Sequence, residues 1–136
     1  MRGNMSRVPA WFDKDFPEFA ELLRAAKDPG RAALAVAALA IARRAPNDEY
    51  LGAWLEHPGN LQELADYVEG LHRRAYELGD GQDGDSPDLD AFRHYLAGSA
   101  LLEALRSGTD APTGALYEAF NAVDDYDSIV EILRST

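Results

Sequence analysis

Two pairs of acidic and histidine side chains in the second half of the chain could bind a metal. In Glu69-x-x-His72 the two side chains are three residues apart, and in Asp90-x-x-x-His94 they are four apart. Both spacings place carboxylate and imidazole on one face of a helix, as metal-binding bundles do. If the two helices form a hairpin, both histidines stand about 10 Å from the turn. One hypothesis is therefore a metal-binding bundle with a site at Glu69, His72, Asp90 and His94.

The alternative interpretation gives these histidines no metal. Di-metal bundles use two Glu-x-x-His motifs, whereas this chain has only the one at Glu69. Leu71 and Ala75 are expected on the core-facing side of the same helix, which places His72 at the margin of that side. We favour two partly exposed histidines that make ordinary charge contacts, and we expect no resident cofactor.

Aspartates concentrate between the two helices that carry these histidines, at Asp80, Asp83, Asp85, Asp88 and Asp90. The spacing lacks the glutamate that closes an EF-hand calcium loop. A G-x-G-x-x-G pattern over residues 79–84 follows a helix rather than a strand, which excludes a dinucleotide-binding loop. A solvated connection is the first interpretation of this segment, an acidic protein-binding patch the second, and a calcium site the third.

A second acidic group lies near the C-terminus and consists of Asp124, Asp125, Tyr126, Asp127 and Glu131. The simple interpretation is that Asp125 or Asp127 caps the last helix. If this group lies at the same end of the molecule as residues 80–90, the two form one negative surface with Tyr126 between its charges. Such a surface would steer basic partners and associate with them quickly at low salt.

The net charge of −11 excludes several classes of partner. Residues 69–136 hold 5 basic and 14 acidic side chains, whereas residues 1–68 hold 8 and 10. A field of that sign repels phosphate backbones and anionic lipid, so we expect no direct binding of nucleic acid or membrane. Because the apolar run over 32–42 is too short to span a bilayer and no secretory signal is recognised, we expect a cytoplasmic protein.

Few residues could carry catalysis. The chain has no cysteine, which excludes thiol nucleophiles and thiolate metal sites. Ser99 lies within a helical pattern and lacks the glycine-flanked elbow that exposes a nucleophilic serine. We therefore interpret Ser99 and Gly98 as small residues that let two helices pack closely. A binding protein is favoured over an enzyme.

Helical spacing of apolar residues predicts the elements that position these groups, and no segment alternates as a strand does. The chain of 136 residues has the size of one domain. We predict an all-α compact bundle of six or seven antiparallel helices over residues 13–136, after a loose arm over residues 1–12. The alanine-rich helix over 29–44 is expected at its centre. The expected helices cover residues 14–26, 29–44, 48–56, 60–78, 87–107, 114–123 and 128–134. The expected caps of the second, third and fifth of these are Asp28, Asn47 and Ser86, with Pro87 in the first turn of the fifth. Aromatic residues at helical spacing are expected in the core or lining grooves: Trp11, Trp54, Tyr67, Tyr76 and Tyr117.

These observations favour a small acidic module that binds a basic partner protein, of inhibitor, immunity or adaptor type, by analogy of fold class alone. The metal-binding bundle is the alternative, and a subunit that self-associates is a third possibility. The expected partner-binding residues come from the two acidic groups of the C-terminal half: Asp80, Asp83, Asp85, Asp88, Asp124, Asp125, Tyr126, Asp127 and Glu131.

Overall fold

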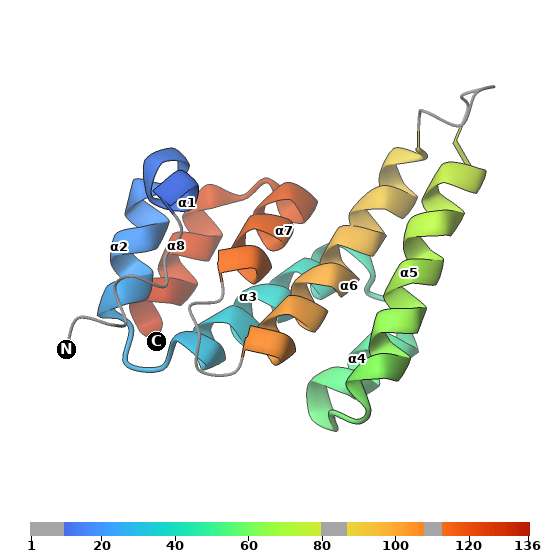
Figure 1. Cartoon of the computed structure of the whole chain (residues 1–136), viewed down its shortest axis with the longest axis horizontal. Coiled ribbons are helices and arrows are strands. Elements are labelled where there is room, and N and C mark those ends of the chain that lie inside the picture. The colour runs from blue at the N-terminus through green and yellow to red at the C-terminus, as the bar shows by residue number, and fades with distance from the viewer. Residues whose placement is uncertain (1–9, 80–86, 108–112) are drawn as a thin grey trace.

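The computed structural model describes residues 10–79, 87–107 and 113–136, and these ranges contain eight α-helices and no strand (Figure 1). The all-α bundle predicted from the sequence is confirmed, with eight helices where six or seven were expected. None of the helices in the described ranges is long and apolar enough to cross a membrane. The helices are α1 Ala10–Asp15, α2 Pro17–Ala25, α3 Pro29–Arg44, α4 Glu49–Glu56, α5 Leu61–Glu77, α6 Leu89–Ser107, α7 Thr113–Val123 and α8 Tyr126–Ser135.

The first predicted helix is two helices, α1 and α2, which meet at Phe16. Pro17 separates them, because proline disfavours the helical conformation of the residue before it. Helix α1 begins at Ala10 and buries Phe12 completely, so residues 10–12 belong to this helix and not to the loose arm that was predicted over residues 1–12. Residues 1–9 of that arm lie outside the described ranges.

Helices α3 and α6 form the centre of the bundle. As predicted, α3 buries alanines on several sides, and it packs against α4, α6, α7 and α8. Alanine lets these neighbours approach closely, and Val36 and Ile41 fill the space between them. Helix α6 packs against α3, α5 and α7, and Figure 1 shows it between them.

Helices α5 and α6 approach closely at Gly98. A Cβ atom on Gly98 would lie 3.3 Å from both Leu71 Cδ1 and Val68 Cγ2, which confirms that the small residue permits this contact. Helix α6 begins at Leu89, where the sequence placed Pro87 in its first turn after a Ser86 cap. The Asp88 carboxylate accepts the Ala91 amide at 3.0 Å and acts as the N-cap. Ser86 lies outside the described ranges.

The connection from α7 to α8 is short because one of its residues adopts the left-handed backbone conformation. Asp124 has φ 51°, and its amide donates to Phe120 O at 2.7 Å, ending α7. Helix α8 then starts at Tyr126, two residues before the predicted start, since Asp125 caps it by accepting the Ser128 amide at 3.1 Å. The predicted capping role of Asp125 is confirmed.

Candidate functional site

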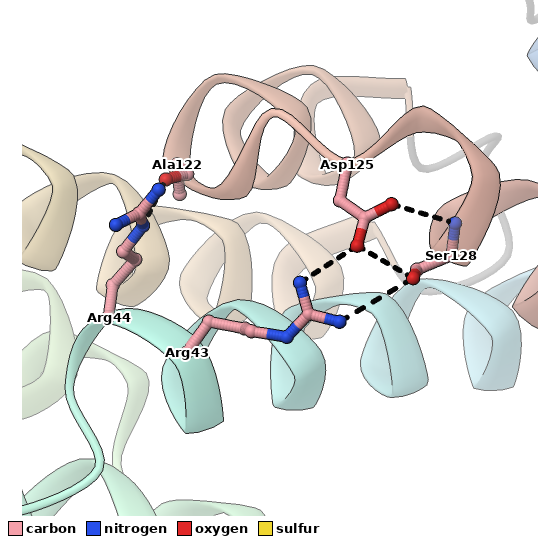
Figure 2. A network of polar contacts seen from close by, with 5 residues as sticks. All are labelled: Arg43, Arg44, Ala122, Asp125 and Ser128. Atoms are coloured by element: carbon pink, nitrogen blue, oxygen red, sulfur yellow. Dashed lines mark hydrogen bonds and ion pairs between the residues drawn. The ribbon is translucent and has the colours of Figure 1, made fainter.

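Asp125 is engaged within the fold (Figure 2). Its Oδ2 accepts from Arg43 Nη1 at 2.8 Å and from Ser128 Oγ at 2.7 Å. The Arg43 guanidinium, together with the Ser128 bonds, lowers the pKa of Asp125 to about 2. Next to it, Arg44 Nε donates to Ala122 O at 2.7 Å. These bonds tie the end of α3 to the α7–α8 connection, so Asp125 has a structural role.

Tyr126 is also held by the fold, although its ring remains partly exposed. Its hydroxyl donates to Glu18 Oε1 at 2.7 Å, and its ring stacks on Phe19 at a centroid distance of 4.6 Å. Burial, followed by the bond to Glu18, raises the pKa of Tyr126 to about 12. The remaining members of the C-terminal acidic group, Asp124, Asp127 and Glu131, are exposed.

The two acidic groups do not merge in the described part of the chain. Asp80, Asp83 and Asp85 lie outside it, and Asp88 caps α6. In Figure 1 the ends of α5 and α6 that flank residues 80–86 lie at the upper right, whereas α8 lies at the left, beyond α7. The condition under which the sequence predicted one continuous negative surface is therefore not met by these elements.

The four residues of the metal hypothesis are not brought together. Within the described ranges, no three His, Asp or Glu side chains are placed to hold an ion. His94 Nε2 lies 2.6 Å from Asp48 Oδ2, while the His72 ring lies 4.7 Å from that of Tyr95. Glu69 and Asp90 are exposed. The helical spacing holds within each pair, but the histidines contact different neighbours.

Asp48 is the centre of a polar network that links α4, α5 and α6. Its side chain is 5% exposed, and it accepts from the Leu51 amide at 3.0 Å and from Tyr67 Oη at 2.7 Å, in addition to its contact with His94. Burial alone would raise the pKa of Asp48, but bonds from Leu51, Tyr67 and His94 outweigh it and lower the pKa. Burial, with the bond to Asp48, raises the pKa of Tyr67 to about 12.

Sequence reasoning missed this network because it placed the α4 cap at Asn47 rather than at Asp48. The network joins the start of α4 to α5 and α6 and lines an open pocket of about 580 Å³. The part of the chain that the structure describes contributes no serine, threonine, cysteine or lysine to this lining. An Asp–His pair without such a nucleophile does not form a catalytic triad. The bonds of Asp48 to Leu51, Tyr67 and His94 are explained by a structural role, since they join three helices.

Five rings from the two ends of the chain form a continuous cluster, which we call the aromatic face. Centroid distances of 5.4 Å, 6.1 Å, 5.6 Å and 6.3 Å link Trp11 to Tyr117, Tyr117 to Phe16, Phe16 to Phe120, and Phe120 to Tyr126. Trp11, Tyr117 and Tyr126 are 46%, 41% and 36% exposed. Rings of this size are seldom left in water in a group, so the face is a candidate interaction site.

A groove along α6 adjoins the aromatic face at Tyr117. It consists of two open pockets that share His72 and Tyr95, of about 450 Å³ between α5 and α6 and about 490 Å³ between α6 and α7. Burial, followed by the charge of Glu103, raises the pKa of Glu118 at its wall. We call it the α6 groove. Its charged lining residues are Asp66, Glu69, Arg93, Glu103, Arg106 and Glu118.

No protein-family model matches the chain, and comparison with curated proteins and with solved structures finds no match. The choice between these sites therefore rests on exposure, ring contacts and charge. By those criteria the aromatic face and the α6 groove stand out, because Asp48 and Asp125 already have partners within the fold.

Proposed function

We propose that this chain is a protein-binding module that holds a basic partner protein against its aromatic face. The observation that carries the proposal is the joint exposure of Trp11, Tyr117 and Tyr126 in one ring cluster. Tryptophan and tyrosine dominate the residues that contribute most binding energy at protein interfaces. An inhibitor, an immunity protein or an adaptor would each use such a surface.

The exposed rings are preorganised for binding. Trp11 meets Tyr117 edge-to-face at an interplanar angle of 86°, and the Tyr126 hydroxyl is fixed by Glu18. Because neighbouring side chains already restrict these rings, a partner immobilises little additional side-chain freedom when it docks. The buried Phe12 and Phe19 support the face from below.

The exposed negative charge favours a basic partner protein. Asp127 and Glu131 are exposed on α8, the helix that begins with Tyr126, and Asp124 is exposed just before it. These carboxylates belong to the half of the chain with 14 acidic and 5 basic side chains. They would raise the association rate with a basic protein and make that rate fall with salt.

The test begins with capture of partners from native lysate by the wild-type protein, followed by measurement of Kd with the purified partner. We expect Trp11→Ala and Tyr117→Ala each to weaken binding by about tenfold or more, since interface hot spots contribute at least that much. Tyr50→Ala is the matched control, because Tyr50 is 37% exposed but lies on α4, outside the aromatic face.

The salt dependence provides a second readout. Neutralising Asp127 and Glu131 together should slow association and flatten its dependence on salt, with a smaller effect on dissociation. A partner whose Kd is unchanged by Trp11→Ala and Tyr117→Ala would refute the proposed face. A captured protein that is acidic and binds independently of salt would refute the proposed partner class.

A further inference from the structure

The α6 groove carries more acidic than basic groups. Among the residues that the structure describes, four carboxylates line its two pockets against two guanidinium groups. Arg106 Nη1 lies 3.8 Å from Glu103 Oε2, so this pair matches one charge of each sign and leaves three carboxylates against Arg93. A group that enters the groove is therefore favoured if it carries positive charge.

Glu118 is the acidic group of the groove that lies on α7. It is half-buried, and it accepts no hydrogen bond from the residues that the structure describes. It lies on α7 beside Tyr117, while Tyr95 reaches the groove from α6. A half-buried carboxylate without a hydrogen-bond donor is strongly stabilised when a ligand brings a positively charged donor to it.

Aromatic rings provide the second element of recognition. Phe92, Tyr95 and Tyr117 line the pocket between α6 and α7. The ring centroids of Phe92 and Tyr95 lie 5.4 Å apart. Ring faces attract ammonium and guanidinium groups within about 6 Å. Each pocket, at about 450 Å³ and about 490 Å³, has room for a long side chain.

Other occupants fit less well. Among the described residues no acidic or histidine group is arranged to bind a bare metal ion. A nucleic acid or a second copy of this chain would bring further negative charge, since the chain itself carries −11. The groove therefore suits a cationic side chain delivered by a peptide segment.

We infer that the α6 groove binds an arginine- or lysine-bearing segment of the partner, with Glu118 as the acceptor for its cationic group and Tyr95 and Tyr117 as its walls. The inference rests on the proposed function, because the same partner would cover the aromatic face and insert this segment past Tyr117. It assigns Glu118, which neither acidic group of the sequence includes, as the specificity-determining residue.

The test uses the whole chain and a blocked peptide, acetyl-Leu-Arg-Gly-Arg-Leu-amide, with its citrulline counterpart, which keeps the shape and removes the charge. Amide shifts in NMR spectra locate the peptide and, followed as the peptide is titrated in, give the Kd. Glu118→Gln removes the groove carboxylate. Glu56→Gln is the matched control, an exposed carboxylate on α4 outside both the groove and the aromatic face.

We expect the arginine peptide to shift the amide resonances of groove residues. Glu118→Gln should weaken binding of this peptide about tenfold or more, because it removes a charged hydrogen bond. Replacing arginine by citrulline should weaken peptide binding similarly, and Glu56→Gln should have little effect. Equal weakening by both Gln variants would indicate general attraction to an acidic protein and overturn the inference. Unchanged affinity in Glu118→Gln, or shifts outside the groove, would also overturn it, provided circular dichroism shows intact folding.

The same variants separate this inference from the proposed function. A partner that depends on Trp11 but not on Glu118 refutes the groove and leaves the aromatic face standing. A partner that depends on neither refutes both. A partner that depends on both, and that competes with the arginine peptide, supports both.

Discussion

Replacement of Asp48 by alanine should be among the most destabilising single changes at a polar residue of this protein. The change removes the α4 cap, which contributes about 1 kcal/mol. It also leaves the half-buried Tyr67 hydroxyl without its acceptor, a loss of about 1–3 kcal/mol, and removes the contact with His94 at 2.6 Å. We expect the free energy of unfolding to fall by about 3 kcal/mol, and Tm by about 10 °C.

The matched control is Asn47→Ala, the neighbouring residue that the sequence alone favoured as the cap. Asn47 is exposed, and the α4 cap bond is made by Asp48, so this change should lower Tm little. A double-mutant cycle of Asp48→Ala with Tyr67→Phe should give a coupling of about 1 kcal/mol. Urea unfolding followed by circular dichroism supplies all these values.

The dependence on pH gives a further check on Asp48. Its folded-state pKa lies below the ordinary value of 3.8, so its stabilising contribution is present above that value and is lost as pH falls through the folded pKa. The stability difference between wild type and Asp48→Asn should therefore shrink below about pH 4. An Asp48→Ala variant with the Tm of Asn47→Ala would refute the reasoning.

Three further predictions concern the α7–α8 connection and the packing of α5 and α6. Wild type should lose its stability advantage over Asp125→Asn as pH falls from about 4 to about 2, because Arg43 holds the folded pKa of Asp125 at about 2 while its ordinary value is 3.8; thermal melts against pH measure this. Gly98→Leu should lower the free energy of unfolding by about 1–3 kcal/mol, because a Cβ atom at Gly98 already lies 3.3 Å from side chains of α5. Gly70→Ala should raise it by about 0.5–1 kcal/mol, because a Cβ atom at Gly70 meets nothing within 4 Å. At Asp124, whose φ is 51°, valine should lower the unfolding free energy by about 1 kcal/mol and glycine should be tolerated.

Local patterns in the sequence predicted the helices well, because their signals are short-range. The apolar residues of α3, its cap at Asp28 and the prolines that precede later helices all act within a few positions, and the predicted bounds of α3 match the structure. The errors occur where two local signals compete. Asn47 and Asp48 can both cap α4, and the choice is made by Tyr67, 19 residues away, and His94, 46 residues away.

The candidate site was less predictable, because exposure depends on contacts between distant residues. The sequence placed Asp125 in a binding surface, but its charge is neutralised by Arg43, 82 residues earlier in the chain. It interpreted Trp11 and Tyr117 as core or groove residues, since periodicity marks an apolar face without showing how completely neighbouring helices cover it. Their exposure becomes visible only when the fold brings the Trp11 ring of α1 against the Tyr117 ring of α7.

The most direct test of the central claim is the affinity of the captured partner for wild type, Trp11→Ala and Tyr50→Ala, measured at low and high salt. We expect a basic partner that binds wild type and Tyr50→Ala equally, binds Trp11→Ala about tenfold more weakly or worse, and dissociates as salt rises. Equal affinity for all three proteins, or binding that salt does not alter, would contradict the claim that this aromatic and acidic surface is the binding site.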